Sequence, residues 1–357
     1  MKKICFILGT RPEIIKLSPV VRECQRLAIP FFVLHTNQHY SPDMDSLFFD
    51  ELGLPRPKYN LGVRESLHGK MVGKMLEGIE EILLKEKPDI VLIQGDTNTV
   101  LAGGLAAAKL QIKVGHVEAG LRSYDRTMPE ELNRVVVDHV SDYLFCPTEK
   151  QRNILLGEGI NNDKITITGN TIVDAVQQNI DRASKDKRYT HYSKEQYVLL
   201  TLHRPANVDD KRVLQNLINI IQKVSQTLQR KVYFPAHPRT KAALERFQIV
   251  TDSTCIVLIE PVQYLEMLVM EKYASLILTD SGGVQEEACI LHVPCVTLRN
   301  NTERPETVDV GANIVAGTTE KDIVFAVKTM MSSSRLWKNP FGEGKAAEKI
   351  LKHLRLS

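Results

Sequence analysis

Residues 4–19 read ICFILGTRPEIIKLSP, and this stretch decides the fold. The apolar run Ile4–Leu8 predicts a buried strand, which ends at Gly9. The residues that follow predict an amphipathic helix over Pro12–Leu27, with proline in its first turn. A buried strand that leads directly into a helix is the repeating unit of a parallel sheet covered by helices on both faces.

The same alternation of apolar strands and amphipathic helices runs through the rest of the chain. In the first half, the further predicted strands are Phe31–His35, Asp89–Ile93, Lys113–Val117, Tyr143–Cys146 and Lys164–Ile167. In the second half, they are Tyr197–Leu202, Lys231–Phe234, Ile256–Ile259, Ser275–Leu278 and Val293–Leu298. We therefore expect an α/β protein with two doubly wound, Rossmann-like domains that face a cleft.

One region interrupts this alternation and suggests the domain boundary. The alternation of strands and helices is interrupted between Thr168 and Ala183. The stretch Ser184–Glu195 is polar and rich in charge, as is typical of a linker. We expect an N-terminal domain over residues 1–172 and a C-terminal domain over residues 173–357, both of usual domain size. The last predicted helix, about residues 344–355, is a candidate to pack back on the first domain.

The composition excludes several classes of protein. The chain has 357 residues, of which 43% are apolar and 25% charged, and its net charge of +3 is too small for a dedicated nucleic-acid-binding protein. The N-terminal apolar run is too short for an export signal, and no run approaches the ~18 apolar residues of a membrane span. Six scattered cysteines show no metal-binding spacing. We expect a cytoplasmic protein with buried, reduced thiols and no bound metal or membrane.

Ligands of such sheets bind beyond the carboxyl ends of the strands, so the polar residues that follow a strand are the candidates for a site. They come from both halves of the chain, which predicts a site in the cleft between the domains. These residues are Thr10, Arg11, Asp96, Glu118, His203, Arg204, His237 and the run Asp280–Gly283.

Two strand-to-helix turns have features of an anion site. In the first, Arg11 and Lys16 add positive charge to a helix start, but an ordinary turn with solvated charges explains them equally well. This turn matches neither a dinucleotide-binding nor an ATP-binding glycine loop. In the second, Ser281–Gly283 exposes N–H groups to a phosphate, and Glu287 one turn later can accept hydrogen bonds from a ribose diol. A plain helix cap does not need paired glycines, so we favour a phosphate site there.

Acidic residues are candidates for proton transfer. Asp96 and Glu118 each follow an apolar strand, and Glu130 and Glu131 follow Met128-Pro129. Carboxylates in one cleft can differ in pKa and so divide acid and base roles. For Glu130 and Glu131 the residues alone favour a different interpretation, because acids in a first helical turn offset the helix dipole.

Basic residues in the second half are candidates for contacts with a diphosphate. His203 and Arg204 end a strand together, where they could hold a diphosphate and assist a departing oxygen. His237 is a weaker candidate. Arg304 lies in a charge cluster after a strand and could reach a phosphate or a uridine.

Together, these segments resemble the non-hydrolysing UDP-N-acetylglucosamine 2-epimerases over nearly the full chain. In order, the matching motifs are GTRPEIIKLSP, QGDTNT, HVEAGLR, MPEE followed by NR, GNTIVDA, DSGGVQEEA and TERPE. The resemblance implies a glycosyltransferase-B type fold and reversible inversion at C2 of the sugar, by elimination of UDP to a 2-acetamidoglucal and re-addition. It also implies a cytoplasmic homodimer that uses no metal or redox cofactor and supplies surface polysaccharide or glycan synthesis.

The same resemblance assigns roles to residues. It implies that the catalytic residues are Asp96, Glu118, Glu131 and His203. The residues that it implies for UDP-sugar binding are Arg11, Lys16, Asp96, Glu118, His203, Ser281, Gly282, Gly283, Glu287 and Arg304. In many bacterial members, a second, activating substrate molecule is bound by residues that correspond here to Gln38, His39, Arg204 and His237. Those members have arginine where this chain has Tyr40, which leaves allosteric activation open.

Several alternatives stay open. Three are enzymes: an epimerase of a UDP-diacetamido uronic acid, a hydrolysing 2-epimerase that releases N-acetylmannosamine, and a glycosyltransferase of the same fold. The motifs GTRPE and TERPE favour N-acetylglucosamine over the uronic acid, whose epimerases tend towards GARPQ. A transferase does not need the three carboxylates of the first half. A non-catalytic nucleotide-sugar sensor could also drop those carboxylates, all of which are present here.

Overall fold

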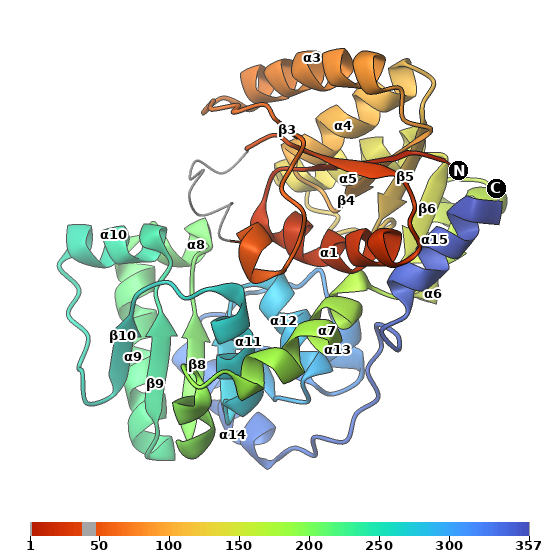
Figure 1. The fold of residues 1–357 in the computed structure, drawn as a ribbon. Helices are drawn as coiled ribbons and strands as arrows, with labels where there is room; N and C mark the ends of the chain where they lie inside the picture. Colours follow the sequence, from red (N-terminus) through yellow and green to blue (C-terminus); the bar gives the residue numbers. More distant parts are fainter. Residues whose placement is uncertain (1, 38–47, 357) are drawn as a thin grey trace. The chain divides into compact units, whose positions relative to one another are not determined.

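The computed structural model describes residues 2–37 and 48–356. The chain forms two compact units, and each is described by itself. Unit 1 comprises Met1–Gln178 and Phe341–Ser357, and unit 2 comprises Asn179–Pro340 (Figure 1). The first compact unit runs to Gln178, and the chain returns to it for its last segment; the domain boundary expected at residue 172 stays a prediction.

Unit 1 is built around a parallel sheet of seven strands among the described residues, in the order β3-β2-β1-β4-β5-β6-β7. The strands are β1 (Ile4–Leu8), β2 (Phe31–His35), β3 (Tyr59–Asn60), β4 (Ile90–Gln94), β5 (Lys113–Val117), β6 (Tyr143–Cys146) and β7 (Ile165–Ile167). The helices are α1 (Arg11–Arg26), α3 (His68–Glu86), α4 (Asn98–Lys109), α5 (Pro129–Val140), α6 (Glu149–Gly157), the short η1 (Asn162–Lys164), the start of α7 (Thr171–Lys185), and α15 (Ala346–Leu356).

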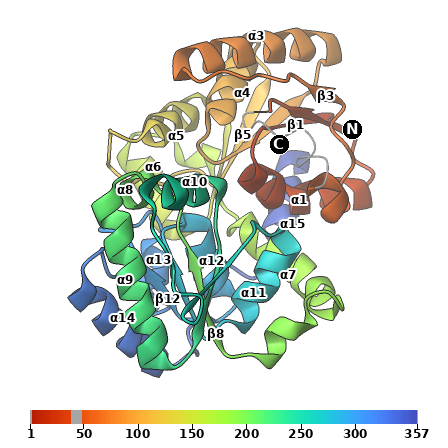
Figure 2. The ribbon, with the colours of Figure 1, turned by 90° about the vertical axis from the view of Figure 1, so that its left-hand side faces the viewer.

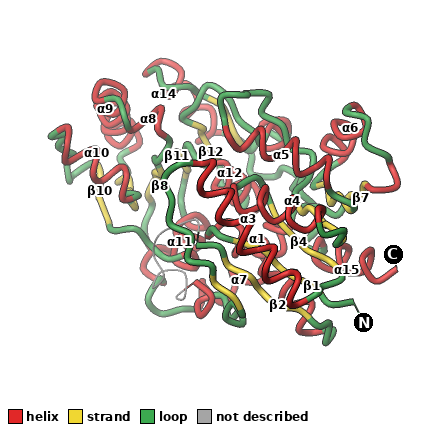
Figure 3. The backbone as a smooth tube through the Cα atoms, turned by 90° about the horizontal axis from the view of Figure 1, so that it is seen from above, coloured by secondary structure: helices red, strands yellow, loops and turns green. Residues whose placement is uncertain are grey.

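Helices cover both faces of this sheet. Figure 1 shows α3 and α4 over one face and α1 with α15 along the other. Figure 3 shows α1 and α4 beside β1 and β4, the central strands. On the α3–α4 side, Ile7 of β1 and Ile93 of β4 pack in one core with Met75 and Ile79 of α3. Burial on both faces explains why a central strand such as β1 is a continuous apolar run.

Helix α1 shows how local sequence sets an element. The Glu13 carboxylate accepts hydrogen bonds from the backbone N–H groups of Gly9 and Thr10, both at 2.7 Å, which satisfies donors at the helix start. Pro19 lies inside the helix and has no N–H to offer the carbonyl of Ile15. The Ser18 hydroxyl donates to that carbonyl at 2.8 Å, so the interior proline leaves no backbone acceptor unsatisfied.

Unit 2 repeats the architecture with six parallel strands among the described residues, in the order β10-β9-β8-β11-β12-β13. The strands are β8 (Tyr197–Thr201), β9 (Lys231–Pro235), β10 (Ile256–Ile259), β11 (Leu276–Thr279), β12 (Cys295–Thr297) and β13 (Asn313–Val315). The helices are η2 (Thr190–Lys194), α8 (Pro205–Val208), α9 (Lys211–Leu228), α10 (Pro238–Phe247), α11 (Tyr264–Tyr273), α12 (Gly282–Ile290), α13 (Pro305–Asp309) and α14 (Glu320–Ser332). Figure 2 shows α9 and α14 on one side of this sheet and α11 on the other.

The two parallel sheets with alternating helices confirm the expected α/β fold class. One local expectation was wrong: the pause predicted between Thr168 and Ala183 is helix α7, whose apolar residues Ile172, Val173 and Val176 are buried. The stretch Ser184–Glu195, expected as a linker, contains the end of α7 and the short helix η2.

All six cysteines are buried free thiols, as predicted. No helix in the described part of the chain has both the length and the apolar character needed to span a membrane.

Candidate active site

In each sheet, the strand order reverses direction between two central strands, and polar residues follow both of them. The reversal lies between β1 and β4 in unit 1 and between β8 and β11 in unit 2. A ligand site is expected outside the carboxyl ends of strands at such a switch point. The residues there are Arg11 and Asp96 in unit 1, and His203 and Asp280 in unit 2.

Glu118 follows β5 and is the most constrained acid of unit 1. Its backbone has φ = 69°, in the left-handed region, and its N–H donates to the carbonyl of Phe145 at 3.1 Å. Only 5% of the residue is exposed. The Lys16 ammonium of α1 lies 2.8 Å from both carboxylate oxygens, and the Gln94 side chain at the end of β4 donates to one of them. The buried pair places a carboxylate and its counterion at the carboxyl end of the sheet.

Asp96 and Glu131 share one cation. Arg134 on α5 donates to Asp96 at 2.6 Å and to Glu131 at 2.6 Å. Asn133, the preceding residue, donates to the Asp96 carbonyl at 2.9 Å. The neighbouring strands β4 and β5 are in register at Gln94 and Val117, so Asp96 and Glu118 follow adjacent strand ends. Asp96 and Glu131 thus lie within reach of one arginine, and Glu118 follows the strand next to the one that Asp96 follows.

Glu131 is more than a first-turn acid. Its carboxylate accepts hydrogen bonds from the N–H and hydroxyl of Ser123 and from the N–H of Tyr124, all at 2.9 Å. Burial opposes its ionisation, but these donors and Arg134 outweigh it and hold the pKa of Glu131 below the usual range. Its side chain is therefore an oriented, ionised carboxylate.

A buried network supports the turn that carries Glu118. Asp138 of α5 lies 2.7 Å from His116 Nδ1, accepts from the Gly120 N–H at 3.2 Å, and accepts from Arg122 at 2.7 Å. Burial opposes ionisation of Asp138, but His116 and Arg122 hold its pKa below the usual value. Sequence reasoning missed this role, although His116, Gly120 and Arg122 all belong to the motif HVEAGLR.

Glu13, at the start of α1, is buried with its carboxylate near the switch point of unit 1. Besides the two backbone donors, the Thr97 hydroxyl donates to it at 2.5 Å. Burial nonetheless dominates and raises the pKa of Glu13 to about 7, although these hydrogen bonds favour the ionised form. Arg11, two residues earlier, packs its guanidinium 4.8 Å from the centre of the Phe48 ring.

In unit 2, His203 and Asp280 form a pair at the switch point. Asp280 follows β11, is fully buried, and lies 3.0 Å from Nδ1 of His203. It also accepts from the backbone N–H groups of His203 and Arg204, at 3.1 and 3.0 Å, and from Asn207. Burial opposes ionisation of Asp280, but His203 and the other donors hold its pKa below the usual value. With Nδ1 held by Asp280, the imidazole presents Nε2 for other partners, and the side chain is 36% exposed.

The phosphate-site candidate forms the start of α12. Ser281 is its N-cap residue, and Gly282 and Gly283 are its first two helical residues. A Cβ atom on Gly282 or Gly283 would meet no protein atom closer than 3.8 Å, and neither has a positive φ. Internal packing therefore does not explain the paired glycines, whereas close approach of a ligand to the backbone does. Glu287 lies further along α12 and is 8% exposed.

The other predicted residues of unit 2 have defined partners. Arg304 forms an ion pair with Glu286 at 2.7 Å. His237 is exposed, and its ring centre lies 5.8 Å from that of His203, so the structure brings these two histidines together. Gln38 and His39, the remaining residues of the allosteric prediction, lie outside the described residues.

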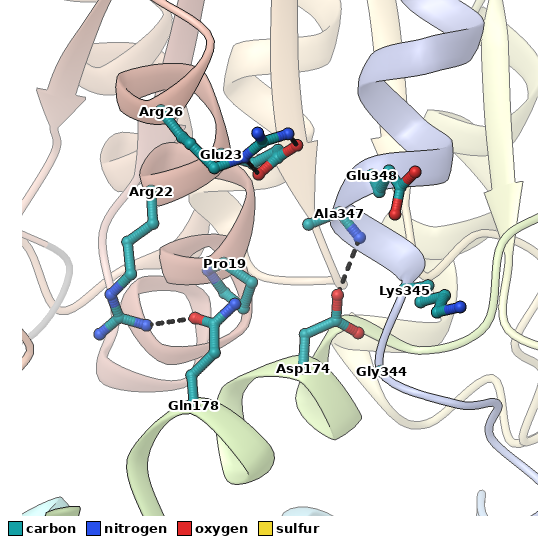
Figure 4. A pocket seen from close by; sticks show the side chains of 10 residues that line it. All are labelled: Pro19, Arg22, Glu23, Arg26, Asp174, Gln178, Gly344, Lys345, Ala347 and Glu348. Carbon is teal, nitrogen blue, oxygen red and sulfur yellow. Dashed lines mark hydrogen bonds and ion pairs between the residues drawn. The ribbon is translucent and has the colours of Figure 1, made fainter.

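A separate pocket of about 380 Å³ lies in unit 1 among α1, the start of α7 and the segment that leads into α15. Figure 4 shows Arg22 of α1 pointing to Gln178 and Asp174 pointing to the backbone of Ala347. The pocket contains none of the predicted site residues. Among residues 2–37 and 48–356, no group of three or more histidine, cysteine or acidic side chains is arranged to hold a metal ion.

Comparisons with known proteins agree with the geometry. The family model described as UDP-N-acetylglucosamine 2-epimerase matches residues 22–355. A UDP-N-acetylglucosamine 2-epimerase of Methanocaldococcus jannaschii is 55% identical over 99% of this chain and 98% of its own, and one of Methanococcus maripaludis is 54% identical over 98% of each. The crystal structure of the M. jannaschii UDP-GlcNAc 2-epimerase in complex with UDP-GlcNAc and UDP has a TM-score of 0.94, with 99% of this chain and all of that chain covered.

Proposed function

The chain belongs to the UDP-N-acetylglucosamine 2-epimerase family, and from this premise we propose that it interconverts UDP-N-acetylglucosamine and UDP-N-acetylmannosamine. The observation that carries the proposal is the set of three acids, Asp96, Glu118 and Glu131, each held by Lys16 or Arg134 where the parallel strands end. Fixed carboxylates of this kind can take a proton from carbon and return one.

The chemistry explains why several carboxylates are useful. The C2 proton of the sugar is not acidic in the ground state, so a carboxylate cannot remove it directly. When the C1–O bond to UDP breaks, positive charge at C1 acidifies that proton. A base takes the proton, the C1=C2 double bond forms, and UDP leaves with the electron pair of the C1–O bond. UDP then adds back to C1 while C2 receives a proton on the opposite face.

The residues of unit 1 perform the proton transfers in this proposal. Lys16 forms an ion pair with Glu118, and Arg134 forms ion pairs with Asp96 and Glu131 and favours the ionised form of Glu131. Ionised carboxylates are ready to act as bases, and each becomes an acid once it has taken a proton. We assign both proton transfers to this set, without assigning either face of the sugar to one residue.

The residues of unit 2 hold the nucleotide and stabilise its departure. The N–H groups at Gly282 and Gly283 and the partial positive charge of the α12 N-terminus favour the diphosphate. His203, whose Nδ1 is paired with Asp280, donates a hydrogen bond from Nε2 to the leaving phosphate. Glu287 accepts hydrogen bonds from the ribose hydroxyls. Arg304 supplies further positive charge for the UDP group, and we propose the same role for Arg11 of unit 1.

Elimination followed by re-addition needs no cofactor, because no electrons are transferred to or from the substrate overall.

We also propose that the protein is a cytoplasmic homodimer. Helix α5 supports the dimer, because Leu132, Val135 and Val136 expose an apolar stripe at helical spacing on it. Replacing Val136 by glutamate is expected to convert the dimer to a monomer in light scattering. A wild-type protein that is monomeric at micromolar concentration would contradict the proposed assembly.

The proposed reaction is tested by proton NMR of UDP-N-acetylglucosamine incubated with the purified protein in D2O. We expect UDP-N-acetylmannosamine to appear, with deuterium at C2 of both sugars. Free N-acetylmannosamine together with UDP would instead indicate the hydrolysing reaction. An unchanged spectrum would contradict the proposal and lead next to a UDP-diacetamido uronic acid as substrate, and then to a transferase reaction with an acceptor.

A further inference from the structure

Glu271, on α11, is a buried acid that the proposed chemistry does not use. Its exposed fraction is 0%, and within the described residues neither carboxyl oxygen receives a hydrogen bond from a protein donor. The nearby Tyr197 hydroxyl does not compensate it, because it donates to the carbonyl of Met270 at 2.6 Å. Burial raises the pKa of Glu271 well above the usual range, and the charge of Glu287 raises it further. Burial therefore favours the neutral acid form of Glu271.

The neighbour of Glu271 is the residue proposed to hold the ribose. Helices α11 and α12 pack against each other, and the carboxyl groups of Glu271 and Glu287 lie within hydrogen-bonding range. Two carboxylates in such a buried place cannot both be ionised, so the pair keeps one proton. Glu287 is the more exposed of the two, at 8%, so the charge is better accommodated there and the proton on Glu271.

We infer that Glu271 is a positioning residue for nucleotide binding: its carboxylic acid O–H donates to the Glu287 carboxylate and fixes Glu287 for the ribose diol. This inference rests on the proposed role of Glu287. A free glutamate side chain has several rotamers, and binding has to order it. The single hydrogen bond from the Glu271 O–H leaves the remaining lone pairs of the Glu287 carboxylate for the two ribose hydroxyls.

The inferred role and a purely structural role predict opposite effects on stability. Replacing Glu271 by methionine removes a buried carboxyl that has no donor and fills its space with an unbranched apolar chain. Such a replacement is expected to leave the melting temperature unchanged or to raise it. The same variant releases Glu287 and weakens ribose recognition. Glu271→Gln keeps a donor, because the amide N–H can replace the acid O–H.

The test measures the dissociation constants of UDP and 2′-deoxy-UDP by calorimetry for the wild-type protein and for E271M, E271Q and E266Q. Glu266 is the matched control, since it lies on the same helix but accepts from Tyr192 at 2.9 Å. We expect the wild-type protein and E266Q to prefer UDP over the deoxy nucleotide. E271M should bind UDP about tenfold more weakly, the loss of one hydrogen bond to a charged group, with little change for 2′-deoxy-UDP. E271Q should retain the wild-type preference.

The outcomes separate this inference from the function on which it rests. Equal affinity of the wild-type protein for UDP and 2′-deoxy-UDP would contradict the proposed ribose contact of Glu287. The positioning role of Glu271 would fail with it. If E271M keeps the wild-type preference for UDP over 2′-deoxy-UDP, the inference about Glu271 is overturned and the proposed function is unaffected. Equal losses in E271M and E271Q, accompanied by a lower melting temperature in both, would show a structural role. Should E271M fail to fold, infrared spectroscopy decides: a protonated carboxyl band that is present in the wild-type protein and absent in E271Q supports the inference, and an unchanged band overturns it.

Discussion

Lys16 and Glu118 form an ion pair that connects the start of the chain to the end of β5 across 102 positions. Both side chains are buried, so neither charge is stabilised by bulk water. A buried pair contributes little net stability relative to apolar residues of similar size, but removal of one partner leaves an uncompensated charge. The pair is therefore better explained by the chemistry of Glu118 than by the stability of the fold.

This argument predicts a specific pattern in three variants. K16M is expected to lower the free energy of unfolding by about 3–5 kcal/mol, because it strands the Glu118 charge in the interior. The double variant K16M/E118M should recover most of that loss while remaining inactive. Denaturant unfolding and an epimerase assay on each variant measure both quantities. A K16M protein as stable as the wild type would show that Glu118 is neutral in the fold.

Glu13 predicts a pH dependence of stability. Its pKa is about 7 in the folded protein against 4.5 as the ordinary value, so between these two pH values the folded state holds a proton that the unfolded state has lost. The contribution of Glu13 to stability is thus complete below about pH 4.5 and is lost as the pH rises towards 7.

Removing this group should remove its share of the pH dependence. Relative to E13Q, the wild-type protein is expected to lose up to about 3 kcal/mol of unfolding free energy between pH 4.5 and pH 7. Chemical denaturation across that range measures the difference, and E348Q, at an exposed position of α15, is the control. Parallel pH profiles for wild type and E13Q would contradict the assignment.

The candidate site residues could be predicted from the sequence, whereas most of the contacts between their side chains could not. Asp96, Glu118, His203 and the glycines of α12 all come directly after predicted strands. They could be selected because ligands of parallel sheets bind beyond the carboxyl ends of the strands. Arg134 was not among the candidates, and Asp280 was a candidate without an assigned partner, because these pairings depend on side-chain geometry that strand and helix patterns do not contain. The Glu131 contacts likewise come from the loop at Ser123 and Tyr124, whose left-handed residue Tyr124 has φ = 58°.

At the scale of elements, α15 shows how unit 1 is completed by the end of the chain. Asp174 on α7 accepts hydrogen bonds from the N–H groups of Ala346 and Ala347, at 3.2 and 3.0 Å, and so caps the start of α15 (Figure 4). Gly344 precedes the helix with φ = 77°, and a Cβ there would lie 1.8 Å from the Gln177 side chain. The turn before α15 therefore requires glycine.

Loss of the cap should loosen this helix more than the rest of unit 1. D174A is expected to lower the unfolding free energy by about 1–2 kcal/mol, the usual effect of removing a helix cap. Amide hydrogen exchange should become faster within residues 346–354. K352A, which alters an exposed residue of the same helix, is the control. Unchanged exchange in α15 of D174A would contradict the capping role.

The elements that the sequence analysis did not find are those with weak or misleading local signals. Helix α7 begins with Thr171, Ile172 and Val173, and β-branched residues of this kind favour strands more than helices. Strand β13 has only three residues and lies at the sheet edge, where pairing with β12 rather than an apolar run defines it. By contrast, β1, β4 and β5 each have five residues that are largely buried, and each was predicted within one residue of its observed bounds.

At the scale of the whole molecule, two sheets with the same kind of switch point divide the proposed work. The polar residues of unit 1 are mainly acids paired with Lys16 and Arg134, which suits proton transfer. Those of unit 2 are a histidine, a helix N-terminus and the acid Glu287, which suits the proposed binding of a nucleotide diphosphate. The expectation of one site shared by both domains stays a prediction, and it follows from the reaction, in which the same substrate must lose both a C2 proton and UDP.

The central claim is that the bond between C1 and UDP breaks during epimerisation. Substrate labelled with ¹⁸O in the bridge between C1 and the β-phosphorus tests it directly, with the label position followed by phosphorus NMR. Free rotation of the departed β-phosphate predicts that the label moves into the non-bridging positions while UDP-N-acetylglucosamine and UDP-N-acetylmannosamine interconvert. Complete epimerisation with all of the label still in the bridge would contradict the account.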